Sequence, residues 1–261
     1  MGVLNVTPDS FSDGGRFLTR GEAVGHALEM IQAGADVVDV GGESTRPGSD
    51  GVDETIEIER IVPVIAELTR LRPGTPVSVD TSRAGVAEAA LAAGASLVND
   101  VTGGRGPGML EVVAGRRAGI VLMHMRGEPR TMQHHTEYLD VVAEVHQFLV
   151  DRAAVAVTAG IAPDRVMVDP GIGFAKDVAG NLRLLSALPD LAALGYPVVV
   201  GTSRKSFIGK LVAGASPDAR LAGSLASIAG AVRLRRVMVR VHDVAETIQF
   251  FTVLSALEGA A

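Results

Sequence analysis

Polar residues stand at the ends of short apolar runs along this sequence, and these are the residues whose types could do chemistry. In the clearest case, the stretch from Arg165 to Lys176, an apolar run delivers one carboxylate, Asp169, and is stopped at once by Pro170 and Gly171. The other runs end in Asn5, Asp39, Asp80, Asn99 with Asp100, His124, Ser203 with Lys205, and Arg240 with His242. One such residue alone is more often a turn or a helix cap. Eight ends of this kind together indicate a functional site.

The composition excludes several kinds of chemistry and of partner. No cysteine is present, which excludes disulfides, thiolate nucleophiles and Cys-ligated zinc. The formal net charge of −6 argues against a general nucleic-acid binder. No segment approaches 18 uninterrupted apolar residues, and the first residues do not have the pattern of a signal peptide. We therefore expect a cytoplasmic protein with neither a nucleic-acid nor a membrane partner.

The elements that must position these polar residues follow from the apolar pattern. Eight apolar runs are expected as strands: 2–6, 36–40, 76–79, 96–101, 119–123, 165–168, 197–200 and 237–241. They lack polar alternation, as strands covered on both faces do. With 47% hydrophobic but only 3% aromatic residues, the core must consist of Val, Ile, Leu and Ala, which favours α/β layers.

Amphipathic stretches between the runs predict helices. Thr19 and Glu22 form a capping box for a helix that ends at Gly34. Ser82 is expected to cap a helix that stops at Gly94. Other helices are expected from Asp53 onward and over 139–158, 180–188, 221–234 and 244–257.

Alternation of strands and helices over 261 residues predicts one domain, residues 1–261, folded as a single (β/α)8 TIM barrel. The segment 33–39 resembles 93–99 in its turn and in its polar strand end, which supports repeated units. A doubly wound open sheet is the alternative, although it usually needs fewer strands. In a barrel, the carboxyl ends of the strands form one catalytic face.

Several motifs carry a resemblance to a known family. They are 5–15 (NVTPDSFSDGG), 41–48 (GGESTRPG), 78–81 (SVDT), 99–103 (NDVTG), 123–125 (MHM), 169–176 (DPGIGFAK), 201–209 (GTSRKSFIG) and 239–244 (VRVHDV). In this order they closely resemble the dihydropteroate synthases, over nearly the whole chain. The resemblance implies that the amine of p-aminobenzoate displaces pyrophosphate from 6-hydroxymethyl-7,8-dihydropterin pyrophosphate, giving 7,8-dihydropteroate.

The resemblance also implies roles for the residues at the strand ends. Asp80, Asn99 and Asp169 would hold the polar edge of the pterin, as carboxylates and amides can. Lys205 would lie against the ring, and the slot would be lined by Met123, Phe174 and Gly201. Arg240 and His242 would meet the pyrophosphate.

For the metal and the second substrate, the resemblance implies further residues. Asn5 would be a ligand of Mg2+, the expected cofactor. Ser206, at a helix start, would meet the carboxylate of p-aminobenzoate. Phe11, Thr45, Arg46 and Pro47 would close over its ring, on loops expected to act as lids. The catalytic set is then Lys205, Arg240, His242 and Asn5, and the resemblance together with apolar final helices suggests a homodimer.

Two other functions stay open: a pterin-binding methyltransferase barrel and a pterin-binding module without turnover. The methyltransferase would not need the segment 45–47 or 203–206. Lys176, Arg204 and Arg126 are expected at the surface or behind the contact residues, and His124 is expected to fill the barrel. The run 233–236 lacks the glycine that the family often has, so a strained backbone is expected there.

Overall fold

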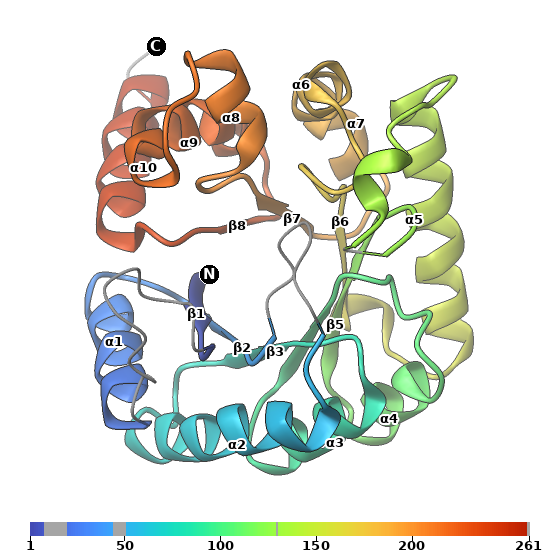
Figure 1. The fold of residues 1–261 in the computed structure, drawn as a ribbon, viewed down its shortest axis with the longest axis vertical. Helices are drawn as coiled ribbons and strands as arrows, with labels where there is room; N and C mark the ends of the chain where they lie inside the picture. Colours follow the sequence, from blue (N-terminus) through green and yellow to red (C-terminus); the bar gives the residue numbers. More distant parts are fainter. Residues whose placement is uncertain (8–19, 44–50, 129, 260–261) are drawn as a thin grey trace.

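A computed structural model describes residues 1–7, 20–43, 51–128 and 130–259 of the chain. Its eight strands form one parallel sheet in sequence order (Figure 1). They are β1 (Gly2–Asn5), β2 (Val38–Gly41), β3 (Val77–Asp80), β4 (Leu97–Asp100), β5 (Gly119–Met123), β6 (Val166–Asp169), β7 (Val198–Gly201) and β8 (Val237–Arg240). A parallel bridge from Gly2 to Val241 joins the last strand region to the first. The expected TIM barrel is therefore confirmed, and the doubly wound alternative is wrong.

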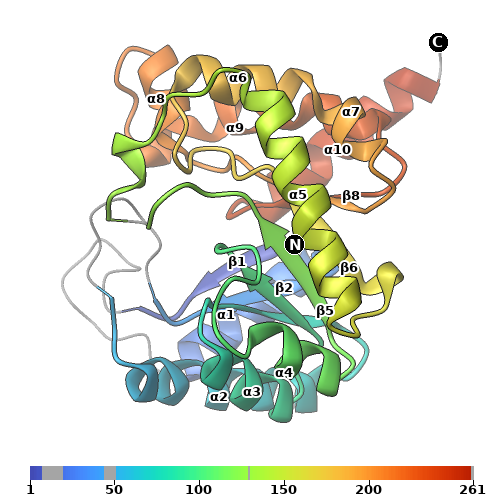
Figure 2. The ribbon, with the colours of Figure 1, turned by 90° about the vertical axis from the view of Figure 1, so that its right-hand side faces the viewer.

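Helices surround the strands on all sides (Figures 1 and 2). They are α1 (Arg20–Gln32), α2 (Glu54–Leu71), α3 (Ala84–Ala92), α4 (Met109–Gly115), α5 (Val141–Thr158), α6 (Val178–Ser186), α7 (Leu188–Ala192), α8 (Ser206–Leu211), α9 (Leu221–Ile228) and α10 (Val244–Gly259). Short 3-10 helices lie at Met132–His134, Pro163–Arg165, Pro217–Arg220 and Ala229–Arg233. The sequence analysis missed α4, which is only two turns long.

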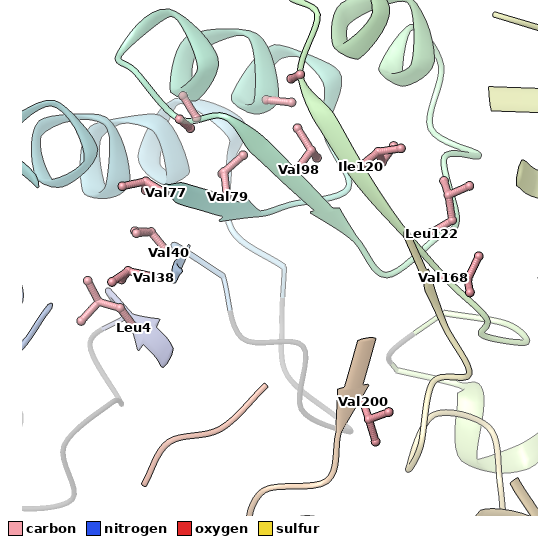
Figure 3. Packing of buried hydrophobic residues seen from close by; sticks show 14 of the residues in the cluster. Leu4, Val38, Val40, Val77, Val79, Val98, Ile120, Leu122, Val168 and Val200 are labelled. Atoms are coloured by element: carbon pink, nitrogen blue, oxygen red, sulfur yellow. The ribbon is translucent and has the colours of Figure 1, made fainter. Parts of the chain in front are cut away.

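Alternate residues of each strand face opposite sides of the barrel wall. One set packs outward, where Val38, Val79 and Leu122 belong to the same buried cluster as Ile61 of α2 and Leu149 of α5 (Figure 3). The other set fills the barrel. Its lower layer is a separate apolar cluster made by Met1, Val37, Leu97, Val121 and Val199, with Met167 and Met238 against it. Both faces of the barrel wall are therefore buried, which explains why the strands are mostly apolar, with Ser78 in β3 and Asp39 in β2 as buried polar residues before the strand ends.

The pairing around the barrel is uneven. Neighbouring strands from β1 to β6 share three or four residue pairs, and so do β7 and β8. Between β6 and β7, Val168 and Val198 form the one registered pair. Between the β8 and β1 regions, three bonds run from the nitrogens of Met1, Val3 and Val241 to the oxygens of Val239, Val241 and Met1, respectively. The strands β7 and β8 therefore have a weak seam on each side.

Two local expectations were wrong. Ser82 does not cap α3, because the residue before the helix is Arg83 and its side chain makes no capping bond. The run 233–236 is not strained, since the backbone leaves the 3-10 helix at Leu234 with φ −91° and ψ 134°, an ordinary extended conformation. By contrast, Asp53 does cap α2 by accepting a hydrogen bond from the nitrogen of Thr55. Thr19 lies outside the described residues.

The repeated turn after the helices is confirmed in detail. Gly34, Gly94 and Gly160 follow α1, α3 and α5 with φ of 103°, 112° and 100°. After each of them, the next nitrogen bonds a carbonyl five residues earlier, as from Ala95 to Ala90. The turn after α4 has the same bonds, but Arg117 holds the left-handed position with φ 53°. An arginine there is strained, because its Cβ crowds the backbone.

Replacing Arg117 by glycine should therefore stabilise the protein by about 0.5–1 kcal/mol. The arginine is exposed, so little packing is lost. Chemical denaturation of the two proteins checks this. The matched control is Gly160→Ala, whose added methyl meets only Ala114 at 3.7 Å and should cost about 1 kcal/mol through its backbone alone. Equal or lower stability of Arg117→Gly would contradict the strain.

Candidate active site

One inward-facing layer at the carboxyl end of the barrel holds most of the predicted site residues. This layer consists of the last inward-facing residue of each strand: Asn5, Gly41, Asp80, Asn99, Met123, Asp169, Gly201 and Arg240. The pairing register advances by two residues between β4 and β5, where Asn99 pairs with Val121, and between β6 and β7, where Val168 pairs with Val198, so the layer is stepped at these two places. The two glycines leave space in the mouth of the barrel. A methyl group on Gly41 would lie 3.5 Å from Cβ of Asp80, and one on Gly201 would lie 3.7 Å from Cβ of Arg240.

Arg240 binds two carboxylates across this layer. Its Nε atom donates to Oδ2 of Asp39 at 2.6 Å, and its Nη2 atom donates to Oδ2 of Asp80 at 2.7 Å. Asp39 also accepts a hydrogen bond of 3.0 Å from Nδ2 of Asn99. Because a carboxylate only accepts, this bond fixes the orientation of the Asn99 amide. The guanidinium thus joins β8 to β2 and β3, and Asp39 extends the network to β4.

Sequence analysis placed Asp39 at a strand end but gave it no role in the site. Its side chain is fully buried, and Oδ1 of Asp39 and Oδ1 of Asp80 are buried without a hydrogen-bond partner in the described part of the chain. Counting alternate residues along β2 would have placed Asp39 inside the barrel. Its pairing with Arg240, 201 residues away, depends on the closure of the barrel.

Burial changes the proton affinities of these groups. It raises the pKa of Asp80 to about 7, although the positive charge of Arg240 opposes the shift. It also raises the pKa of Asp169, against Lys205. For Arg240, burial would lower the pKa, but the Asp39 and Asp80 carboxylates outweigh it and raise the pKa. The guanidinium therefore stays charged, and Asp80 binds a proton more readily than an exposed carboxyl does.

Lys205 enters the mouth of the barrel from the loop after β7. Its Nζ atom donates to the carbonyl of Ile172 and lies 4.6 Å from the ring centroid of Phe174. Burial lowers the pKa of Lys205 to about 8, with Asp169 opposing the shift. Gly173 has φ 84°, and a methyl group there would come within 2.9 Å of Cδ of Lys205. A glycine at 173 is thus needed for the close contact between this loop and Lys205.

Lys176 takes the second of the two positions that the sequence analysis allowed. It is not a surface charge, since it is 3% exposed, and it stands behind the contact residues. Its ammonium donates to the carbonyls of Gly171 and Phe174, at 3.0 and 2.8 Å, and meets Nδ1 of His124 at 3.0 Å. Because an ammonium only donates, Nδ1 of His124 is the unprotonated ring nitrogen. Lys176 thus fastens the turn that presents Phe174 to Lys205.

The remaining predicted site residues lie outside the inward-facing layer. His242 contacts Ser203, whose hydroxyl lies 3.0 Å from its Nδ1 atom. Ser206 is exposed at the start of α8, as the sequence predicted. Phe11, Thr45, Arg46 and Pro47, and with them the expected lids, lie outside the described residues.

Two hollows adjoin the layer. A cavity of about 680 Å³ extends from Asp80 over the loops after β3, β4 and β5. At its edge Arg83 makes ion pairs with Glu43 and Glu57, a cluster that the sequence analysis did not identify. A smaller cavity of about 360 Å³ has Asn5, His242 and Arg204 in its lining. Asp80, expected to bind the pterin, therefore borders the larger cavity, and Asn5 and His242, expected near the diphosphate, border the smaller one.

Comparison with known proteins identifies the family. A model of pterin-binding enzymes matches residues 1–242. The dihydropteroate synthase of Synechocystis sp. is 46% identical over 258 residues, which are 98% of this chain and 89% of that protein. The chain belongs to the dihydropteroate synthase family of pterin-binding enzymes. It is thus a transferase, like its relatives.

Solved dihydropteroate synthases have the same fold. The enzyme of Xanthomonas albilineans with 4-aminobenzoic acid superposes with a TM-score of 0.91 at 48% identity, covering 98% of this chain and 92% of that one. A structure of the same synthase in complex with 7,8-dihydropteroate gives a TM-score of 0.88 at 45% identity, with the same coverage.

His124 contacts Lys176, which holds the turn that carries Phe174 in the site of this synthase. A prediction on the pH dependence of stability follows from His124. Burial, with the nearby charge of Lys176, lowers the pKa of His124 to about 3. The unfolded chain takes up a proton near pH 6.5 and the folded chain does not, so the histidine costs stability as the pH falls through 6.5 towards 3. His124→Asn keeps an acceptor for Lys176 and does not titrate.

Between pH 7 and pH 5.5, wild type should therefore lose about 1 kcal/mol more stability than His124→Asn. Denaturant unfolding of both proteins at several pH values measures this difference. Buried carboxyl groups with raised pKa values change stability in the opposite direction, but they do so in both proteins and cancel. A constant difference across this range would show that the fold does not lower the pKa of His124.

Proposed function

We propose that the inward layer at the carboxyl end of the barrel carries out the dihydropteroate synthase reaction. The amine of p-aminobenzoate attacks the exocyclic carbon of 6-hydroxymethyl-7,8-dihydropterin pyrophosphate. A C–N bond forms, the C–O bond to pyrophosphate breaks, and the amine loses a proton. The observation that supports this most is the buried Asp80 carboxyl with one unpaired oxygen, beside Asn99 and Arg240. Such an oxygen needs a ligand with N–H donors.

The pterin edge would meet three acceptors. Oδ1 of Asp80 accepts from one ring or amino N–H, and Asp169 accepts from another. Asn99 gives its NH2 group to Asp39, so its carbonyl oxygen is the atom that faces a ligand donor. Met123 and Phe174 border the ring as apolar surfaces, and Gly201 leaves room for it. Lys205, charged below about pH 8, lies against the ring carbonyl.

The pyrophosphate would leave towards Arg240, His242 and Asn5. Arg240 uses Nε and Nη2 to hold Asp39 and Asp80, so we assign Nη1 to an oxygen of the diphosphate. Little general-base help is needed for a neutral aniline, and the work of these residues is positioning and charge stabilisation. Ser206 offers its exposed hydroxyl to the carboxylate of p-aminobenzoate. For Phe11, Thr45, Arg46 and Pro47, which lie outside the described residues, the family resemblance alone implies a role with the same substrate.

Mg2+ fits this arrangement as an ion held mainly by the substrate. The described residues contain no group of three or more histidine, aspartate or glutamate side chains that could hold a metal by themselves. An ion that binds through one amide oxygen and phosphate oxygens needs no such group. Asn5, half-buried at the end of β1, would supply that oxygen. When bound, Mg2+ would neutralise charge on the leaving pyrophosphate.

We also propose a homodimer and a cytoplasmic location. No helix in the described part of the chain could cross a membrane. Exposed apolar side chains lie on α10 and at the end of α8: Ile248, Val253, Leu257, Leu211 and Val212. Such a surface suits an interface. Sedimentation should give twice the chain mass, and Val253→Lys with Leu257→Lys should give the monomer. A monomeric wild type would exclude the dimer.

The decisive assay mixes the protein with Mg2+, p-aminobenzoate and the dihydropterin pyrophosphate. Dihydropteroate and pyrophosphate should form in equal amounts, and excess EDTA should stop their formation. If the protein binds the pterin but forms no product, the result would support the pterin-binding module without turnover. Activity on methyltetrahydrofolate would support the methyltransferase.

In the same assay, Lys205→Ala should lose activity at least about a hundredfold. Arg240→Ala should also lose activity, but it leaves two buried carboxylates unpaired and should lower stability by about 3–5 kcal/mol. Arg240→Lys keeps the charge and serves as the more stable comparison. Thermal unfolding separates the two effects. Near-native turnover in Lys205→Ala and Arg240→Lys would contradict these roles.

A further inference from the structure

Arg204 stands between Ser203 and Lys205 with an unusual backbone. Its φ is 60°, one of four positive values among the described residues other than glycine. A side chain with a Cβ is disfavoured in this region, so surrounding contacts must hold it there. Both of its peptide groups are held: its nitrogen donates to Oγ of Ser224 at 2.9 Å, and its carbonyl accepts from Nη1 of Arg220 at 2.9 Å. Ser224 in turn donates to the carbonyl of Arg220.

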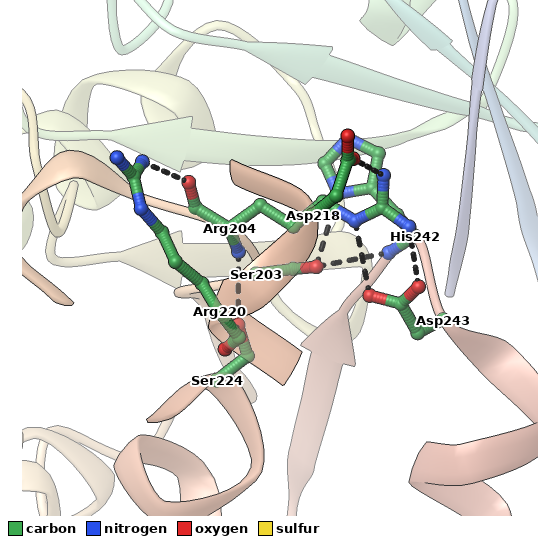
Figure 4. Close-up of polar contacts among 7 residues, drawn as sticks. All are labelled: Ser203, Arg204, Asp218, Arg220, Ser224, His242 and Asp243. Carbon is green, nitrogen blue, oxygen red and sulfur yellow. Dashed lines mark hydrogen bonds and ion pairs between the residues drawn. The ribbon is translucent and has the colours of Figure 1, made fainter. Parts of the chain in front are cut away.

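The side chain of Arg204 reaches from the β7 loop to the end of β8 (Figure 4). Its Nε atom donates to Oδ2 of Asp243 at 3.1 Å, and its Nη2 atom donates to Oδ1 at 2.5 Å. One residue earlier on both segments, Oγ of Ser203 accepts from the nitrogen of His242 at 3.2 Å and lies 3.0 Å from its Nδ1 atom. Two adjacent residue pairs therefore join the two segments, and we call 203–204 with 242–243 the β7–β8 clamp.

The β7–β8 clamp lies directly beside the residues that the reaction needs. Lys205 follows Arg204 in the chain, and His242 precedes Asp243. The left-handed backbone at Arg204 sets the direction in which Lys205 leaves the loop, while the two-point contact with Asp243 sets the end of β8. We propose that Arg204 is a positioning residue, which fixes Lys205 and His242 relative to each other. The inference rests on the proposed synthase function.

An exposed surface ion pair would not fix the positions of Lys205 and His242. The ion pair between Arg204 and Asp218 is an exposed pair of this kind and serves for comparison. Arg204 also meets Oδ1 of Asp218 through Nη1 at 3.3 Å. The Asp218 side chain is 82% exposed, whereas that of Asp243 is 16% exposed. An exposed single contact contributes little order, because both side chains stay solvated. A planar guanidinium that binds both oxygens of a mostly buried carboxylate fixes an orientation.

The test compares four variants in the synthase assay. Arg204→Gly accepts the left-handed backbone and removes the contact with Asp243, Arg204→Lys keeps the charge, and Asp243→Asn keeps the shape. Each should lower kcat by about ten- to a hundredfold, since small misplacement of reacting groups has effects of that size. Asp218→Asn, the matched control, should stay within about twofold.

Two further readouts separate positioning from general damage. Binding of 6-hydroxymethyl-7,8-dihydropterin, which lacks the pyrophosphate, should fall by a smaller factor than kcat in every variant, because Asp80, Asn99 and Asp169 lie on other strands and of the pterin contacts only that of Lys205 is disturbed. The double variant Arg204→Gly with Asp243→Asn should have a kcat no lower than that of the slower single variant, because the two substitutions remove the same interaction between Arg204 and Asp243.

Specific outcomes would overturn the inference. They are near-native kcat in Arg204→Gly, equal losses in Arg204→Gly and Asp218→Asn, or losses that multiply in the double variant. If Arg204→Gly does not fold, Arg204→Lys and Asp243→Asn decide. A wild-type protein without synthase activity would instead refute the proposed function, so the two failures are distinguishable.

Discussion

The guanidinium of Arg240 between Asp39 and Asp80 is the interaction on which the active site depends. Two carboxylates this deeply buried would repel each other and take up protons without a cation between them. With Arg240 in place, one oxygen of Asp80 is held and the other stays unpaired in the mouth of the barrel. The same contact positions Asp39, which orients the amide of Asn99. Removal of one cation would therefore disturb three residues of the site.

Much of the fold could be predicted because its signals are local. Each strand is a short, mostly apolar run with a polar residue near its carboxyl end or in the loop that follows, and each repeated turn has its own glycine or, in one case, Arg117. Alternation along the strands places Asn5, Asp80, Asn99 and Asp169 on the inner side, so the location of the site also follows from the sequence.

What could not be predicted depends on closure of the barrel. The two partners of Arg240, Asp80 and Asp39, are 160 and 201 residues away in the sequence, and they meet Arg240 only because β8 joins β1. Lys176 was expected at the surface or behind the contact residues, and the sequence did not decide between the two because the carbonyls that make its burial favourable come from the fold of the turn around it. No sequence pattern marks the positive φ of Arg204, since the neighbouring helix α9 and Arg220 hold it there.

The two weak seams beside β7 and β8 have a consequence for how the barrel is held closed. These two strands carry Gly201 and Arg240, and the loops that follow them carry Lys205 and His242, so most cations of the site belong to the strand pair β7–β8. The acids of the site belong to the other six strands, β1 to β6. Few backbone bonds join the strand pair to the other six strands, and the ion pairs of Arg240 with Asp39 and Asp80 connect the two groups of strands. The charged residues that serve catalysis thus also help to hold the barrel closed.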